Sequence, residues 1–202
     1  RARHLARRFN RGWPDLTIDS HTSDGSIHRY HLTYDSANNA ASVAPEPLEY
    51  VRRTMLPSVS ASLEKRTGLP TFFYGNFRDP DDPAKGWQTY SPLPRYGSNY
   101  RGLAGRMDIL LEAYSYISFR ERCVVTYEFI VECFDYAIAH STEILRANQA
   151  ATPPRRIGIS YGKEGWQGQN HLFTYSAEAD GEAEIRSVDL ATLRQRRLDG
   201  PP

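Results

Sequence analysis

Two ionisable residues, His21 and Glu112, end apolar segments of strand length, LTIDSH and MDILLE. In open α/β sheets, ligands bind at the carboxyl ends of the strands. A neutral imidazole in that position is a good metal ligand. Because Leu111 and Ala113 partly desolvate Glu112, we expect its pKa to rise towards the range of a general base. Asp19 shares a strand face with His21 and is placed to orient a neighbouring group.

The other histidines form weaker metal-binding patterns. His21, His28 and His31 are spaced as H-x6-H-x2-H, but in a regular strand the last two point to opposite faces, which disfavours joint ligation. The one H-x-x-E of the sequence runs from His140 to Glu143 and falls inside a predicted helix. For each of these residues, an ordinary structural role fits the same pattern.

The segments before and after His21 predict a helix and two strands. Apolar residues at helical spacing predict a helix over residues 2–12, ended by its glycine. Alternating residues then predict a strand over 16–21, a turn over 22–25 and a returning strand, IHRYHLTY, over 27–34. This arrangement places His21 where the first strand meets its turn.

The middle of the chain predicts a helix, a strand and a long loop. The helix covers 47–67, is kinked or divided at Pro57, and ends at Gly68. Its predicted apolar face consists of Leu48, Val51, Met55, Val59 and Leu63. The strand TFFYGNF covers 71–77, and the loop over 79–99 is rich in Pro, Gly and Asp. Loops of that length in a compact domain are usually functional or mobile. MDILLE then has the pattern of a buried central strand.

A long helix is predicted after MDILLE. Ser118 and Glu121 have the spacing of a capping box. The predicted core-facing side of this helix consists of Val124, Tyr127, Val131, Phe134, Ile138 and Leu145. Cys123 and Cys133 lie on the same helix, about 15 Å apart at 1.5 Å per residue. Since a disulfide needs a much closer approach, we expect two buried free thiols.

The order of these elements predicts an α/β protein whose sheet lies between helices. Residues 1–152 are expected to form one domain. Residues 153–202 contain the short strand candidates IGISY, HLFTY and EIRSV, and are expected to form a small β-rich extension.

Composition excludes some classes of protein. The 202 residues carry a formal net charge of +1, which argues against a dedicated nucleic-acid binder. No apolar run approaches the roughly 20 residues of a membrane helix, so we expect no membrane partner. The basic start, RARHLARR, is not followed by the apolar segment of a signal peptide. The sequence therefore does not indicate a compartment.

Two segments resemble one enzyme family. PDLTIDSHTSDGSIHRYHLTY is similar to the segment that carries the third zinc ligand in a bacterial branch of the zinc carboxypeptidases of the carboxypeptidase A type. RYGSNYRGLAGRMDILLEAYSY resembles the later segment of the same branch, which ends in the catalytic glutamate. Their order and separation also fit the family, and with the surrounding helices the resemblance covers roughly residues 1–150.

The resemblance implies a three-layer α/β/α domain with a mixed sheet and one zinc ion. It implies that His21 is the third zinc ligand and that Glu112 is the general base and later the general acid. It also implies, more weakly, that substrate-contacting groups lie on the preceding loop, namely Tyr90, Arg95, Tyr96, Asn99 and Tyr100. An arginine on that loop, Arg95 or Arg101, could bind a substrate carboxylate through two hydrogen bonds, although a solvated surface arginine fits equally well.

The sequence also departs from the family. The first two zinc ligands of the family come from an H-x-x-E motif upstream of the third, and no such motif precedes His21 here. The family's upstream substrate-binding arginines have no counterpart either. We therefore expect this chain to be the C-terminal part of a longer catalytic domain, missing its N-terminal part, and the 202 residues alone to bind zinc weakly and be inactive.

The sequence thus predicts a zinc-dependent hydrolase that cleaves a C-terminal peptide or amide bond. One alternative is a non-catalytic module that binds a peptide or glycan on the same scaffold. Another is a deacylase or amidase that applies the same zinc chemistry to a non-peptide substrate.

Overall fold

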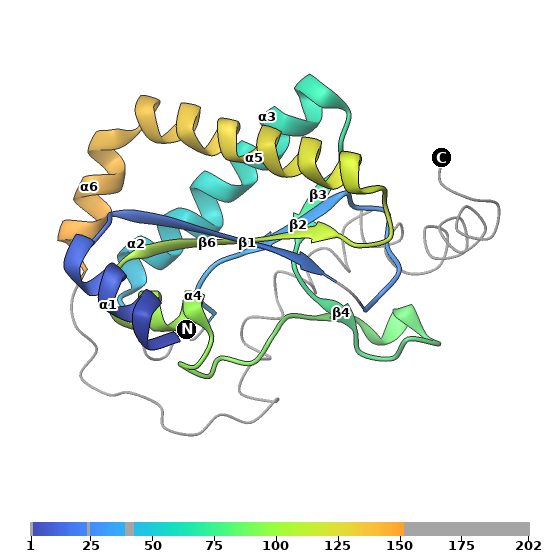
Figure 1. Ribbon diagram of the computed structural model, residues 1–202, viewed down its shortest axis with the longest axis horizontal. Coiled ribbons are helices and arrows are strands. Elements are labelled where there is room, and N and C mark those ends of the chain that lie inside the picture. The colour runs from blue at the N-terminus through green and yellow to red at the C-terminus, as the bar shows by residue number, and fades with distance from the viewer. Residues whose placement is uncertain (1, 24, 39–42, 152–202) are drawn as a thin grey trace.

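The computed structural model describes residues 2–23, 25–38 and 43–151, which form a mixed α/β fold around a four-stranded sheet (Figure 1). The order across the sheet is β1 (Leu16–Ser23), β6 (Met107–Tyr114), β2 (Leu32–Asp35) and β3 (Thr71–Phe73). β1 is parallel to β6, β2 is antiparallel to β6, and β3 is parallel to β2. The predicted α/β class is therefore confirmed, and MDILLE lies in an interior strand.

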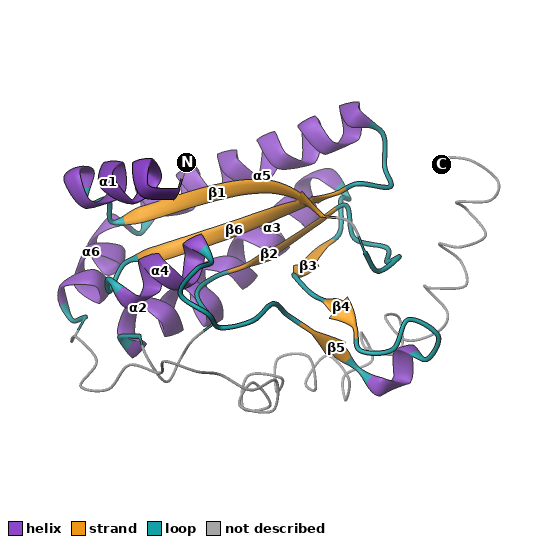
Figure 2. Ribbon diagram, turned by 60° about the horizontal axis from the view of Figure 1, so that its bottom comes forward, coloured by secondary structure: helices purple, strands orange, loops and turns teal. Residues whose placement is uncertain are grey.

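Helices lie on both faces of this sheet (Figures 1 and 2). α3 and α5 lie over one face, and α1 and α4 lie on the other. The helices are α1 (Ala2–Gly12), α2 (Pro45–Tyr50), α3 (Leu56–Thr67), α4 (Gly97–Leu103), α5 (Phe119–Ala139) and α6 (Ser141–Gln149). A separate two-stranded sheet consists of β4 (Asn76–Phe77) and β5 (Trp87–Gln88), connected through a short 3-10 helix at Pro83–Lys85.

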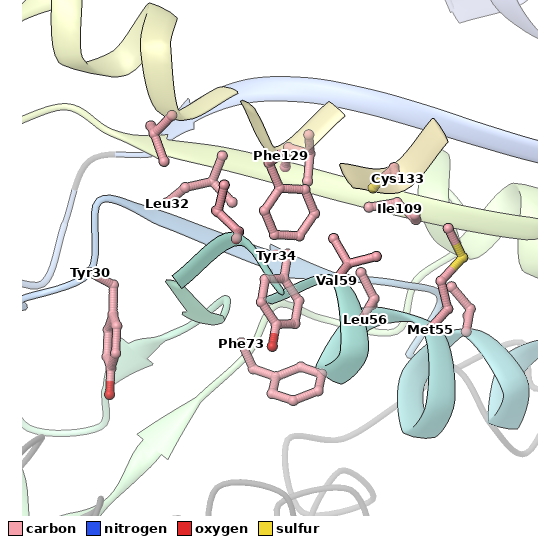
Figure 3. Packing of buried hydrophobic residues seen from close by; sticks show 14 of the residues in the cluster. Tyr30, Leu32, Tyr34, Met55, Leu56, Val59, Phe73, Ile109, Phe129 and Cys133 are labelled. Carbon is pink, nitrogen blue, oxygen red and sulfur yellow. The ribbon is translucent and has the colours of Figure 1, made fainter. Parts of the chain in front are cut away.

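The two faces of the sheet differ in polarity because residues of β6 alternate between them. Met107, Ile109 and Leu111 are fully buried in the main hydrophobic core, whereas Asp108 and Glu112 belong to the opposite face. Figure 3 shows the core between the sheet and the helices α3 and α5. Its largest fully buried side chains include Leu32, Met55, Leu56, Val59 and Phe129. The face that carries Asp108 and Glu112, called the polar face below, is therefore the one that can hold a functional site.

The helical segment before β3 is divided, as Pro57 predicts. A π-helical turn, Val51–Met55, separates α2 from α3 and ends two residues before Pro57, while Tyr50, Met55 and Leu56 keep right-handed helical dihedral angles. Gly68 ends α3 in the left-handed conformation, with φ of 73°. The predicted apolar face is confirmed, since its five residues are all buried.

Two strand predictions are wrong in extent. IHRYHLTY forms a strand only over Leu32–Asp35, because the backbone before it bonds elsewhere: the N–H of His28 donates to the Tyr114 hydroxyl and that of His31 to the Pro70 carbonyl. TFFYGNF is divided into β3 and β4. Conversely, β1 runs two residues past His21, so the predicted turn begins later.

The capping box of α5 is confirmed, but the predicted core-facing side is wrong. Ser118 accepts from the N–H of Glu121, whose carboxylate accepts from the N–H of Ser118. The buried apolar side chains of α5 are Val125, Phe129 and Cys133, and Glu132 is buried beside them. Both apolar stripes have helical spacing, so periodicity alone does not identify the one that the sheet covers. Of the predicted side, Val131 is partly buried, and Val124, Tyr127, Phe134, Ile138 and Leu145 are exposed.

The helix also ends earlier than predicted, because the chain breaks at His140 and restarts as α6. Both cysteines are free, with Cys133 buried as expected but Cys123 exposed. None of the described helices is long and apolar enough to span a membrane. The predicted extension over 153–202 lies outside the described residues.

Candidate functional site

The candidate site lies at the carboxyl ends of β1 and β6. These two strands pair in parallel register, and His21 is the direct partner of Glu112. Partners in neighbouring strands point to the same face of a sheet. Both side chains therefore belong to the polar face, at adjacent positions. The His21 side chain is 51% exposed and Glu112 is partly exposed, so a ligand from solvent can approach this pair.

Asp19 orients the histidine, as the shared strand face predicts. Its Oδ1 lies 3.0 Å from Nε2 of His21. Its other oxygen, Oδ2, accepts from Nη2 of Arg101 at 2.8 Å. Because Arg101 binds the second oxygen of Asp19, the carboxylate would have to break that ion pair to move away from the His21 imidazole. With Nε2 directed at Asp19, Nδ1 is the ring nitrogen left for other contacts.

Arg101 is therefore an internal ion-pair residue and not an open anion-binding arm. It joins Asp19 on β1 to Asp108 on β6, where its Nε donates to Oδ2 of Asp108. The arginine side chain is 12% exposed, and Asp108 is fully buried. Burial raises the pKa of Asp108, and Arg101 opposes that rise by stabilising the carboxylate. Gly97 permits this approach, since a Cβ there would lie 3.1 Å from the guanidinium and from Asp19.

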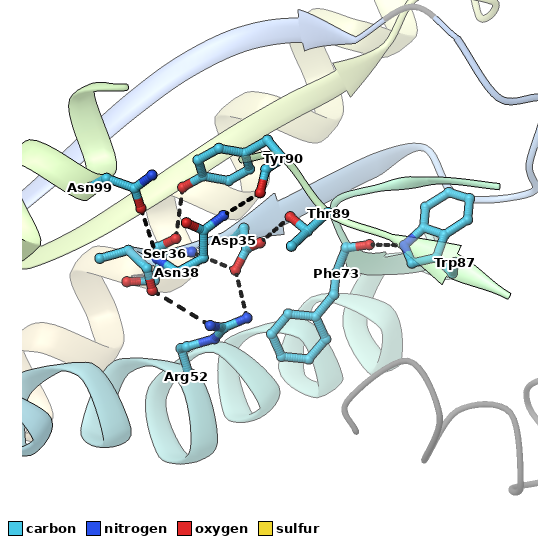
Figure 4. A network of polar contacts seen from close by, with 10 residues as sticks. Asp35, Ser36, Asn38, Arg52, Phe73, Trp87, Thr89, Tyr90 and Asn99 are labelled. Carbon is cyan, nitrogen blue, oxygen red and sulfur yellow. Dashed lines mark hydrogen bonds and ion pairs between the residues drawn. The ribbon is translucent and has the colours of Figure 1, made fainter. Parts of the chain in front are cut away.

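A second buried ion pair lies beside it on the same face. Asp35, at the end of β2, is 3.1 Å from Nη2 of Arg52 in the π-helical turn and accepts from the Thr89 hydroxyl at 2.6 Å (Figure 4). Burial raises the pKa of Asp35, against the lowering effects of Arg52 and Thr89. No motif or spacing in the sequence distinguishes Asp35, Arg52 or Asp108. The feature that could have identified Asp108 is its position inside the apolar strand MDILLE, where a carboxylate needs a buried partner.

Two of the predicted substrate residues instead hold the long loop in place (Figure 4). The Tyr90 hydroxyl donates to the Ser36 carbonyl at 2.8 Å. Burial raises its pKa well above the usual value. Asn99 is fully buried; its Oδ1 accepts from the N–H of Asn38, while its Nδ2 donates to the carbonyls of Ser91 and Leu93. Their polar groups are therefore engaged with the backbone.

The other three predicted substrate residues lie nearer the surface. The Arg95 guanidinium lies over the ring of Tyr96, 5.0 Å from its centroid, and donates to the Tyr96 hydroxyl. Tyr100 is 36% exposed and its hydroxyl exchanges hydrogen bonds with Asn10 of α1. Arg95 and Tyr100 are therefore exposed, whereas Tyr96 is partly buried beneath the guanidinium.

Of the other histidines in the described part of the chain, His28 packs among aromatic rings and His140 lies at a helix junction. His28 is buried in an aromatic cluster, stacked on Tyr114 with 4.3 Å between ring centroids, and desolvation lowers its pKa to about 4. His140 lies 3.9 Å from Glu143 at the α5–α6 junction. α6 packs at the opposite end of β1, where Asn148 donates to the Asp15 carbonyl. His140 and Glu143 therefore do not join His21.

The described donors at this edge do not complete a zinc site. A catalytic zinc ion normally has three protein ligands and a water. His21 supplies one imidazole, Asp19 is held by Arg101, and no group of three His, Cys, Asp or Glu able to hold a metal occurs among the described residues. One histidine does not fit a zinc centre without further ligands.

No protein-family model matches this chain, and neither a curated protein nor a solved structure is similar to it.

Proposed function

We propose that this chain carries the general base of a zinc carboxypeptidase-like hydrolase that cleaves a C-terminal peptide or amide bond. The observation that carries the proposal is the register of β1 and β6, which makes His21 and Glu112 direct partners on the polar face. If His21 and Glu112 lay at opposite ends of the sheet, they could not belong to the same catalytic site. The mixed sheet with helices on both faces is compatible with the three-layer fold that the family resemblance implies.

In this proposal, Glu112 moves the proton of the reaction. Its carboxylate accepts a proton from the attacking water as the water oxygen bonds to the scissile carbonyl carbon. The protonated Glu112 then donates the same proton to the leaving nitrogen as the carbon–nitrogen bond breaks. The products are a shortened acid and a free amine, so the glutamate returns to its starting state.

In this proposal His21 is one of the zinc ligands, and Asp19 and Arg101 hold its ring in place. The Asp19 contact occupies Nε2 and leaves Nδ1 as the nitrogen for a ligand. The zinc part of the proposal requires ligands in addition to His21. Its direct test is the metal content of the full-length gene product after dialysis, measured beside activity.

The decisive experiment is Glu112→Gln in the full-length gene product, assayed for amino-acid release from peptides with free C-termini. Glutamine keeps the volume of the side chain but cannot accept the proton, so kcat should fall by about 10²–10⁴-fold. KM should change little, because the loss falls mainly on the transition state. Glu64→Gln, an exposed substitution on α3, is the matched control and should leave kcat unchanged.

Near wild-type kcat for Glu112→Gln would overturn the proposed role of the glutamate. Wild-type protein that binds peptides without releasing any amine would favour the binding module. N-acyl substrates should be assayed in parallel, since their cleavage in place of peptides would assign the deacylase alternative.

A further inference from the structure

The outer side of α5 is an apolar surface that the described fold does not use. Val124, Tyr127, Phe134 and Ile138 are 44%, 65%, 59% and 76% exposed. Together with the half-buried Val131, they define the outer stripe of α5. In Figure 1 this helix runs along one side of the molecule, and no other described segment lies beyond it. Exposed apolar surface of this extent on a single helix marks an interaction site more often than a free surface.

The spacing of the outer stripe indicates what kind of element covers it. Its residues follow one another at intervals of three, four, three and four. That alternation is the a and d pattern of a helix that packs along another helix, each side chain entering a space between side chains of the neighbour. The inner stripe, Val125, Phe129 and Cys133, is spaced four and four and is already buried against the sheet. α5 thus has one side for its own core and one for a second helix.

We propose that the outer stripe is a dimer interface, in which α5 packs antiparallel against α5 of a second copy of this chain. The proposal is independent of the hydrolytic function. A two-fold axis through the middle of the stripe pairs the patch with itself, so one surface supplies both sides of the interface. Such an axis across the helix makes the two helices antiparallel.

The area of the stripe suits such a dimer. An aromatic side chain presents roughly 150–250 Å². The stripe, together with the exposed Phe119 at the start of α5 (73% exposed) and Leu145 of the following helix α6 (44% exposed), offers on the order of 700 Å². A standard interface uses about 800 Å² per partner, while the largest apolar patch of a monomer is typically about 300–600 Å².

The charges at the two ends favour the antiparallel orientation. Arg120 is exposed in the first turn of α5, whereas Asp135 is exposed near its last turn and Glu143 follows on α6, which also carries the exposed Arg146. Antiparallel packing sets the basic end of one copy beside the acidic end of the other. Parallel packing would set like charges side by side, which is unfavourable.

The first test is sedimentation equilibrium of the wild-type chain over a wide concentration range, beside Tyr127→Glu and Ala61→Glu. The wild type should be a dimer. Tyr127→Glu places a charge in the middle of the stripe and should raise the dissociation constant at least about 100-fold. Ala61→Glu adds the same charge at an exposed position of α3 and should leave the dimer intact. A monomeric wild type, or equal effects of the two variants, would overturn the proposal.

The second test addresses orientation. In the antiparallel dimer, with Val131 near the axis, the Cys123 residues of the two copies lie about 24 Å apart at 1.5 Å per residue. A short bismaleimide should therefore cross-link Val131→Cys in a Cys123→Ser background but not the wild type. Efficient linkage through Cys123 would indicate parallel packing and overturn the antiparallel assignment.

A charge exchange completes the test. Arg120→Glu and Glu143→Arg should each weaken the dimer, and the double variant should restore it, because both ends then carry exchanged charges. Failure of the double variant to restore association, with Tyr127→Glu still disruptive, would overturn the charge argument for the orientation.

Discussion

The paired strands β1 and β6 carry ionisable side chains towards both ends, but the two groups differ in burial and in ion pairing. Towards the amino end, Asp108 is fully buried and Arg101 closes the network by bridging it to Asp19. At the carboxyl end, His21 is half exposed and Glu112 partly exposed. The charges of the first group pair with one another, whereas the second leaves polar surface that a ligand can contact.

This difference separates ionisable residues that support the fold from those available for chemistry. A buried ion pair is costly to break because the remaining partner stays buried without compensation. A half-exposed residue loses little when it is replaced, since water takes over its contacts. Substitutions at the two ends should therefore differ in stability, activity and pH dependence.

The largest effect on stability is expected at the amino end of the two strands, the closed end, where Arg101 bridges Asp108 and Asp19. Arg101→Met removes the guanidinium and leaves Asp108 buried without its positive partner. The free energy of unfolding should fall by about 3–5 kcal/mol. Urea denaturation monitored by tryptophan fluorescence measures this loss. The exposed Arg95→Met should change stability by no more than about 0.5 kcal/mol, and an equally small change for Arg101→Met would remove the distinction between the two ends.

A somewhat smaller effect concerns pH. His28 has its pKa lowered from 6.5 to about 4 by burial. The unfolded chain therefore binds its proton at higher pH than the folded chain does. The stabilising contribution is present above pH 6.5 and is lost as the pH falls towards about 4, to a total of about 3 kcal/mol.

His28→Phe keeps a ring against Tyr114 and removes the titration. The stability of this variant should fall less steeply than that of the wild type between pH 6.5 and about 4, when urea midpoints are compared. His140→Gln, which replaces a partly exposed histidine, is the control and should keep the wild-type slope. A slope for His28→Phe equal to that of the wild type would show that the buried imidazole does not govern acid sensitivity.

Local sequence signals predicted much of the fold. The interior strand MDILLE, the capping box at Ser118, the division at Pro57 and the stop at Gly68 are confirmed. Each depends on a run of apolar residues or on backbone chemistry within one turn. His21 and Glu112 were each predicted near the carboxyl end of a strand, and β1 and β6 place them there as register partners.

The remaining features depend on tertiary contacts. Two apolar stripes of α5 have comparable helical spacing, and only the position of the sheet decides which one is buried. Arg101 has the same sequence appearance as an anion-binding arginine, and its role follows from Asp19 and Asp108 on two different strands. Tyr90 lies in a loop composition typical of pockets, yet its hydroxyl bonds to a carbonyl 54 residues away in sequence. Periodicity does not encode such long-range partners.

The smallest effect on stability is expected at the carboxyl end of the two strands, the open end, where His21 and Glu112 lie. His21→Ala removes an imidazole that is 51% exposed and that contacts the carboxylate of Asp19. Asp19 keeps its bond to Arg101, so no buried charge is left without a partner. The free energy of unfolding should therefore change by less than about 1 kcal/mol, in the range of an exposed ion pair. Asp19→Ala should cost more, because it withdraws a carboxylate from an arginine that is only 12% exposed. Urea denaturation of both variants at neutral pH gives the comparison. A loss for His21→Ala as large as that for Arg101→Met would mean that the histidine is part of the closed network, and its assignment to an open site would be wrong.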